Sequence, residues 1–476
     1  MSPTTYKTPG VYVEEISTLP PSIAEVGTAI PAFLGTTTIH DSQKGVEVQE
    51  INSLREFEDR FGRAPATQWK VSYNEVQKTF VILDQEGKHV DRFSEPACLL
   101  WYAIDHYFRN GGSRCYVLSV GASSADAPLT AKQFEDGLDA LKRYDEPTLV
   151  VIPEATKLGK DDYGSVCRQA LRHAAELKDR FVILDAKPPS NTLDSTAMEG
   201  MREPLGKDNL DRGALYFPFL LTTLVHQIDE EKIQVVGLPG SASPSPTDPG
   251  AAGQPTTSGV TLSSLASTET IHYNRIKRLL GDQRVILPPS AAITGAIASV
   301  DRERGVWKAP ANVGLQAVIA PVLQVTDEQQ GLLNMDATTG KSINAIRSFA
   351  GKGTLVWGAR TLAGNDNEWR YISVRRLFIT IEESVKKATE FAVYEANDTS
   401  TWLKVKGMID SYLYTLWERG ALRGAKAEEA YFVNVGIPKT MTTDDILNGL
   451  LIVEIGLAAV RPAEFIILRF SHKVNQ

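Results

Sequence analysis

The hydrophobic pattern of the chain is most regular in its first half, where three short apolar runs follow one another at similar intervals. They read CYVLSV from Cys115, TLVVIP from Thr148 and RFVILD from Arg180. Runs of this length, rich in valine, leucine and isoleucine, are typical of strands buried on both faces of a sheet. Between the second and third runs, residues 162–180 have the apolar spacing of an amphipathic helix. Repeated strand–helix–strand units predict an α/β domain with a mainly parallel sheet, which we place at residues 31–340.

Residues 237–259 interrupt this pattern. The segment GLPGSASPSPTDPGAAGQPTTSG is rich in proline, glycine, serine and threonine and offers almost no apolar side chain to bury. This composition predicts an exposed, flexible loop inserted in the α/β domain. A domain boundary at this point is the alternative.

From about Lys341 the pattern changes. TLVWGART predicts a strand, and two long helical patterns follow it within residues 368–420. Three strand candidates come next, EAYFVNV, LLIVEIGLAAV and EFIILRFSH, so we predict a compact α+β domain at residues 341–476. The second helical pattern has a stripe of apolar residues typical of a buried helix face: Trp402, Val405, Ile409, Tyr412 and Leu416.

Both ends of the chain carry a strand-like segment. YKTPGVYVEEI, from Tyr6 to Ile16, has the β-branched and aromatic content of a strand, and prolines 9, 20 and 21 separate it from the rest of the chain. EFIILRFSH forms a similar segment near the other end. Because an exposed strand edge is a template for another chain, two interpretations are open. Each terminal strand pairs within its own domain, or each extends to a neighbouring chain.

Composition and charge exclude several classes of protein. The chain has 476 residues, of which 42% are hydrophobic and 23% charged, as in ordinary globular domains. Its net charge of −8 argues against a protein that binds nucleic acid through a strongly basic face. The longest apolar stretch, residues 450–460, contains Glu454 and is too short to span a bilayer. No basic segment followed by an apolar run opens the sequence, so we expect synthesis in the cytoplasm without a signal peptide.

The chain lacks the sequence patterns of common active sites. Its seven histidines are scattered, so no HExxH and no short-spaced pair of metal ligands occurs. GKS at residues 340–342 has Met335 where a phosphate-binding loop requires its first glycine. No glycine-rich turn follows the apolar strands, and no GxSxG occurs. We predict no catalytic residue, no metal and no cofactor; the alternative is an α/β enzyme whose site is assembled from scattered residues.

Six blocks of sequence, taken in order, resemble the contractile tail sheath proteins of long-tailed phages, tailocins and phage-like injection systems. The first is YKTPGVYVEEISTLPPSIAEVGTAIPAFLG, and the second is ILPPSAAITGAIASVDRERGVWKAPANVGL at residues 286–315. GTLVWGARTL and EWRYISVRRL follow. TWLKVKGMIDSYLYTLWERGALRG and GLLIVEIGLAAVRPAEFIILRF complete the series. The resemblance extends over residues 6–38 and 285–470.

This resemblance implies a structural subunit that polymerises helically, with arms that exchange strands between neighbours. It implies an N-terminal arm at residues 1–30, an outer α/β domain at 31–340 and an inner α+β domain at 341–476. The strand of the N-terminal arm would consist of Val11, Tyr12, Val13, Glu14, Glu15 and Ile16. The strand of the C-terminal arm would consist of Phe465, Ile466, Ile467, Leu468, Arg469 and Phe470.

The resemblance also implies partners. These are further copies of the chain, sheath paralogues, an inner tube protein, and baseplate and terminal cap proteins, without direct nucleic acid contact or stable membrane insertion. Contraction would drive the tube through a target membrane. The implied particle is a phage tail, a tailocin, or an extracellular or cell-anchored injection system, and the sequence does not distinguish them. A static tail or baseplate component is a further alternative.

Residues 438–449 resemble the region of the family near the tube. Lys439, Asp444 and Asp445 are therefore candidate contacts to oppositely charged groups of the tube protein. A purely structural interpretation is equally open. Thr443 would cap a helix, and the two aspartates would be favoured in its first turn by the helix dipole.

Overall fold

The chain folds into two compact units. The small unit consists of residues 23–26 and Ile381–Val460, and the large unit of Gly27–Thr380 with the described residues from Arg461 onward. The predicted division at residue 341 is not where the units divide, because the strands after it complete the sheet of the large unit. The computed structural model describes residues 23–41, 43, 45–123, 128–187, 192–238, 260–465 and 467.

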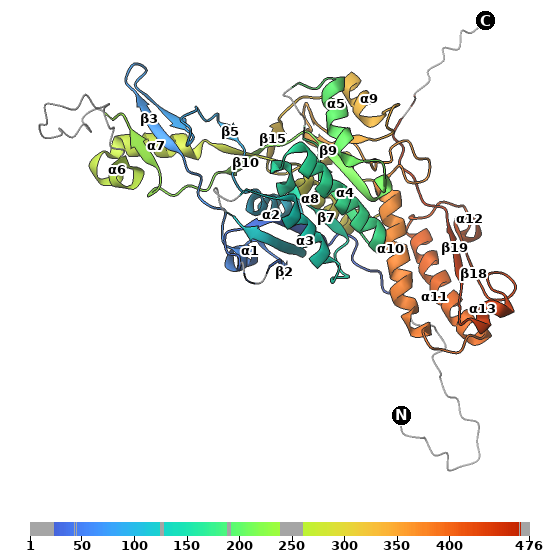
Figure 1. Ribbon diagram of the computed structural model, residues 1–476. Helices are drawn as coiled ribbons and strands as arrows, with labels where there is room; N and C mark the ends of the chain where they lie inside the picture. Colours follow the sequence, from blue (N-terminus) through green and yellow to red (C-terminus); the bar gives the residue numbers. More distant parts are fainter. Residues whose placement is uncertain are drawn as a thin grey trace, which may run out of the picture. The chain divides into compact units, whose positions relative to one another are not determined.

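A nine-stranded sheet organises the large unit (Figure 1). The apolar runs from Cys115, Thr148 and Arg180 form three of its inner, parallel strands, as expected. The sheet is mixed, because antiparallel strands close both edges. In spatial order the strands are β14 (Val313–Gly314), β17 (Gly353–Val356), β16 (Ile343–Phe349), β9 (Gly213–Phe217), β8 (Phe181–Asp185), β7 (Leu149–Val151), β1 (Pro31–Thr37), β6 (Cys115–Ala122) and β2 (Glu47–Ile51).

Helices cover both faces of this sheet, so successive residues of one strand enter different cores. In β8, Val182 and Leu184 pack on one side, and Phe181 and Ile183 on the other. The first core receives α3 (Ala131–Leu141), α4 (Lys160–Leu177), α5 (Ser195–Arg202) and α9 (Asp327–Asn334). The second face receives α1 (Leu54–Phe61), α2 (Leu100–Arg109) and α8 (Ser290–Arg304). The short 3-10 helices are η1 (Pro153–Lys157), η2 (Glu203–Leu205) and η3 (Leu210–Arg212).

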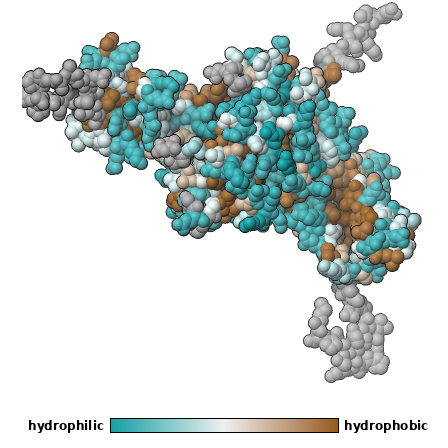
Figure 2. Space-filling model, in the orientation of Figure 1, coloured by the Kyte–Doolittle hydropathy of each residue, from teal (hydrophilic) through white to brown (hydrophobic). Residues whose placement is uncertain are grey.

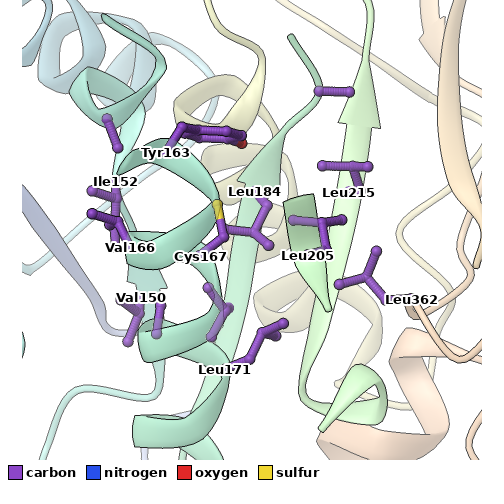
Figure 3. Packing of buried hydrophobic residues seen from close by; sticks show 14 of the residues in the cluster. Val150, Ile152, Tyr163, Val166, Cys167, Leu171, Leu184, Leu205, Leu215 and Leu362 are labelled. Atoms are coloured by element: carbon purple, nitrogen blue, oxygen red, sulfur yellow. The ribbon is translucent and has the colours of Figure 1, made fainter. Parts of the chain in front are cut away.

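Figure 3 shows why residues beyond 341 belong to the large unit. Leu362 lies in the same cluster as Leu171 of α4 and Leu215 of β9, and all three are fully buried. Burial of one such leucine stabilises a fold by about 1.5–3 kcal/mol. The segment after β17 is therefore part of the core of the large unit and not of a separate domain.

Two smaller sheets extend the large unit. One contains β15 (Val318–Pro321), β10 (Leu220–Val225), β13 (Arg284–Leu287) and β5 (Phe93–Ser94). The other contains β12 (Val260–Thr261), β11 (Gln234–Val236), β3 (Lys70–Asn74) and β4 (Thr79–Leu83), and packs with α6 (Leu262–Thr268) and α7 (Thr270–Gly281). Residues 239–259, most of the predicted flexible loop, lie between β11 and β12 and outside the described residues.

The small unit is built on two long helices and a two-stranded sheet. The predicted stripe is confirmed: Val405, Ile409, Tyr412 and Leu416 are buried, and Trp402 is half-buried. Within the described ranges, no helix is long and apolar enough to cross a membrane. The elements are α10 (Ile372–Thr389), within which the units divide, η4 (Glu390–Ala392), α11 (Thr399–Glu418), α12 (Ala427–Ala430), β18 (Tyr431–Val435), α13 (Thr443–Leu447) and β19 (Val453–Leu457).

Candidate functional site

The sheet of the small unit contains only β18 and β19 among the described residues. The two strands are antiparallel, with Tyr431 opposite Leu457. One face lies on α11, where the Tyr431 hydroxyl donates to the Asp410 carbonyl oxygen at 3.2 Å and Val433 is buried. An isolated two-stranded sheet is only marginally stable in water. Its outer edges therefore offer backbone groups to a further strand.

Apolar side chains gather on the surface of the same unit, as Figure 2 shows by its brown residues. Leu447 of α13 is 80% exposed, and Phe432 of β18 is 49% exposed. Others lie in the connections between β18, α13 and β19: Ile437, Leu450 and Ile452. Large exposed apolar areas on a folded domain indicate interaction surfaces.

The described part of the N-terminal segment contacts this unit. Glu25 forms an ion pair of 3.0 Å with Arg419, the C-cap of α11, and the backbone N–H of Val26 donates to the Ser384 hydroxyl of α10 at 3.2 Å. The predicted arm residues Val11 to Ile16 lie outside the described residues. The structure thus fixes the point from which that segment starts, and the assignment of its strand remains a prediction.

The C-terminal segment leaves the small unit after Val460 and continues in the large unit. There Glu464 forms an ion pair of 2.6 Å with Arg360. Phe465 and Ile467 are 68% and 76% exposed and belong to no strand. The other residues predicted for this arm, Ile466, Leu468, Arg469 and Phe470, lie outside the described residues.

The candidate tube contacts lie around α13. Its N-cap is Thr442 and not Thr443, because the Thr442 hydroxyl accepts from the Asp445 backbone N–H at 3.2 Å. The Asp445 carboxylate in turn accepts from the Thr442 backbone N–H at 2.8 Å, which lowers the pKa of that carboxyl. Asp445 therefore has a structural role at the helix start. Lys439 and Asp444 are exposed, and their contact with a tube stays a prediction.

Open α/β sheets usually bind ligands beyond the carboxyl ends of their strands, at the point where the order of the strands in the sheet reverses. The large unit contains such a point. Here β6 and β7 lie on opposite sides of β1, and Glu154 follows β7. Its carboxylate accepts from the Thr36 backbone N–H at 2.5 Å and from the Leu99 backbone N–H at 2.9 Å. Leu99 is the N-cap of α2 and lacks a side-chain cap.

Glu154 thus occupies the donors that an anionic ligand would use at such a helix start. The residue is 1% exposed, and burial raises its pKa, against the opposing effect of those hydrogen bonds. A cavity of about 370 Å³ beside it is lined by Cys98, Lys157 and Asp162, among others. Glu154 was not among the residues predicted from the sequence, although an acidic residue directly after a buried strand is a signal that could have indicated it.

Three of the described histidines are buried, in different parts of the fold. Burial lowers the pKa of His106 to about 4, of His173 to about 3 and of His226 to about 4. His40 Nδ1 lies 2.8 Å from the Ser119 hydroxyl, but Ser119 is fully buried in β6, between β1 and β2. Over the described part of the chain, no three His, Cys, Asp or Glu side chains are grouped so that they could hold a metal ion.

Comparisons with known proteins agree with the predicted resemblance. The family model for the phage tail sheath C-terminal domain matches residues 364–473. The tail sheath protein of Vibrio phage KVP40 is 26% identical over 141 residues, which cover 30% of this chain. That match spans only 21% of the length of the phage protein.

Solved structures match over almost the whole chain. The sheath complex of an extracellular contractile injection system, PVC, in the contracted state is 30% identical, with a TM-score of 0.64 and 99% of both chains covered. The contracted helical sheath of the anti-feeding prophage (AFP) is 31% identical, with a TM-score of 0.64, and the match covers 98% of this chain and 100% of that one. The mixed α/β, multidomain fold is therefore that of sheath proteins. This chain belongs to the family of contractile tail sheath proteins.

Proposed function

We propose that the chain is the repeating subunit of a contractile sheath, polymerising helically around an inner tube by exchanging strands with its neighbours. One observation carries the proposal: the small unit has a sheet of only two described strands, surrounded by exposed apolar residues. The chain also supplies strand-like segments at residues 11–16 and 465–470. These segments, donated by neighbouring subunits, would complete the sheet.

The physics of strand addition supports a helical polymer. A donated strand gains backbone hydrogen bonds along the whole edge that it covers, and its alternate side chains bury apolar surface. The donating segment and the accepting edge are different surfaces, so each contact is heterologous. Repetition of a heterologous contact yields a ring or an open helix and not a closed dimer.

The proposed arrangement places the arms and the small unit next to the tube. The large unit forms the outer body, in line with the outer α/β and inner α+β domains implied by the family resemblance. Lys439, Asp444 and Asp445 would contact the inner tube protein. The polymer would end on baseplate and terminal cap proteins, and the parts would be made in the bacterial cytoplasm.

Contraction in this proposal requires no catalytic residue. Subunits stay joined by their arms while their bodies shift as rigid parts into a denser packing. An extra ~800 Å² of apolar burial per subunit would supply at most ~20 kcal/mol. Ordering and desolvation would reduce this value, but the sum over many subunits could still drive a tube through a membrane.

A position in the ring next to the baseplate is a second candidate. A chain in the baseplate structure of the anti-feeding prophage is 31% identical to this one, with a TM-score of 0.64. A sheath paralogue restricted to that ring would have the same fold and arms. It would polymerise only when the baseplate proteins are present.

Negative-stain microscopy of the purified full-length chain tests the proposal. The test variant lacks residues 1–19, and the matched control lacks residues 241–258, a deletion of similar length within the proline- and glycine-rich segment. We expect hollow tubes from the full-length chain and the control, and none from the test variant. Small particles from every protein, with and without the tube protein, would contradict sheath assembly by arms.

A further inference from the structure

Glu464 directly precedes the predicted C-terminal arm and is held by a bidentate ion pair. The Arg360 Nη2 donates to Glu464 Oε2 at 2.6 Å, and the Arg360 Nε donates to Oε1 at 3.0 Å. The two residues are 104 positions apart in the chain. Two parallel hydrogen bonds fix both the distance and the orientation of a carboxylate, which a single contact cannot do.

Two further side chains donate hydrogen bonds to this carboxylate. The side-chain amide of Asn334 donates to Oε1 at 2.7 Å, and the Tyr371 hydroxyl donates to Oε2 at 3.2 Å. Burial alone would raise the pKa of Glu464, but the hydrogen bonds from Arg360, Asn334 and Tyr371 outweigh it and lower that pKa. The carboxylate is therefore bound in its charged form.

The arginine itself is held in place by the large sheet. Its backbone N–H donates to Asn344 Oδ1 at 2.8 Å, and its carbonyl oxygen accepts from Asn344 Nδ2 at 2.8 Å. Asn344 lies in β16 and also donates to the Leu215 carbonyl of β9 at 3.2 Å. The Arg360 side chain is 2% exposed. A buried guanidinium without a carboxylate would be strongly unfavourable, so this site requires Glu464.

The N-terminal segment is attached in a weaker way. The Glu25–Arg419 pair is partly exposed, with 28% of the glutamate and 48% of the arginine side chain accessible. Exposed ion pairs contribute little to stability because water and salt screen them. The two terminal segments therefore differ both in the unit that holds them and in the strength of the hold.

We propose that Arg360, Asn334 and Tyr371 form a clamp that fixes Glu464, and with it the base of the C-terminal arm, to the large unit. The arm binds a second copy of this chain. Force transmitted between subunits therefore reaches the nine-stranded sheet through Glu464. This inference rests on the proposed sheath function. Glu464 is a positioning residue, because it acts through the arm that follows it.

Limited proteolysis of the unassembled chain tests the clamp without reference to assembly. Chymotrypsin cleavage after Phe465 requires the neighbouring Glu464 to leave its site. We expect Glu464→Gln to accelerate this cleavage about tenfold, and Tyr371→Phe to accelerate it by a smaller factor. Asp301→Asn is the matched control, because it breaks a buried ion pair of 2.5 Å with Arg376 elsewhere in the large unit. Equal rates for the wild type and Glu464→Gln, measured where both are folded by circular dichroism, would overturn the proposal.

Tube formation then separates this inference from the proposed function. If the wild type forms tubes, we expect Tyr371→Phe and Glu464→Gln to form at least fivefold fewer at limiting concentration, with thermal stability no lower than that of Asp301→Asn. Faster cleavage with unchanged tube formation would overturn the clamp as a carrier of force. The absence of wild-type tubes under all conditions would instead contradict the proposed function, and with it the role of the clamp in assembly.

Discussion

The large and the small unit of this protein use their strands differently. In the large unit, β8 has a parallel neighbour on each side, and each of its five residues is buried. In the small unit, β18 pairs only with β19 in the described part of the chain, and only Val433 of its five residues is buried. Within the described residues, the inner strands of the first sheet have a partner on both sides, whereas each strand of the second sheet has a partner on one side only. Substitutions in the large sheet should therefore change mainly the stability of the fold, and substitutions in the small sheet mainly the association of subunits.

The largest effect on stability is expected in the large sheet. Ile183→Ala removes a fully buried side chain from β8 and should lower the free energy of unfolding of the large unit by about 2–5 kcal/mol, because it leaves a cavity. Urea denaturation, with hydrogen exchange of β8 as the local measurement, checks this value. Ile271→Ala, on the 72% exposed Ile271 of α7, is the control and should change stability by less than about 0.5 kcal/mol. A loss below about 1 kcal/mol for Ile183→Ala would contradict the tight packing of this sheet.

A pH-dependent effect of intermediate size is expected from His106. Burial lowers its folded-state pKa to about 4, although a hydrogen bond with the Gln316 carbonyl opposes this effect. The unfolded chain takes up this proton near pH 6.5, so the stabilisation is complete above that pH and is lost as the pH falls towards 4. Between about pH 6.5 and 5 the wild type should lose about 2 kcal/mol more than His106→Gln.

Urea denaturation of both proteins at several pH values gives this difference. Asp185 acts in the opposite direction: burial raises its pKa to about 7, so the stability it contributes is lost as the pH rises towards 7. Both proteins contain Asp185, and its contribution cancels in the comparison. Parallel stability curves for the wild type and His106→Gln would show that His106 does not stay neutral in the folded state.

The smallest effect on stability, and a large one on association, is expected in the small sheet. Phe432→Ser changes a half-exposed side chain of β18 and should alter the free energy of unfolding by less than about 1 kcal/mol. The same variant should form few or no tubes, because it removes apolar contact area next to the open edge. Sedimentation and negative-stain microscopy measure this, with Ile271→Ser as the exposed control on the large unit. Normal tubes from Phe432→Ser would exclude this face from the subunit contact.

Local sequence pattern predicted the elements that local forces decide. The runs at β6, β7 and β8 were recognisable because strands buried on both faces consist almost entirely of apolar residues. The stripe on α11 was recognisable because a single face of that helix is buried. The predicted helix cap, Thr443, is one position after the observed cap, Thr442. Both residues are good caps, and only the backbone geometry distinguishes them.

Contacts between distant segments could not be predicted in this way. The sequence of β16 is compatible with a strand, but its pairing with β9 could not be predicted from the sequence. Because of that pairing, residues 341–380 belong to the large unit. Glu154 meets Thr36 across 118 residues, and Glu464 meets Arg360 across 104. Such partners become visible only when the fold brings them together. The family resemblance, in contrast, depended on blocks of sequence and needed no contact.

The small unit is assembled from two pieces of chain with the whole of Gly27–Thr380 between them, which has a consequence for the timing of biosynthesis. Translation proceeds from the N-terminus, and domains begin to fold as they emerge. Glu25 is made early but finds Arg419 only after the strands of the large sheet have left the ribosome. The open sheet of β18 and β19 forms later still. On the proposed sheath function, a growing chain on a polysome would lack the surface that joins it to its neighbours, and premature polymerisation during translation would be avoided.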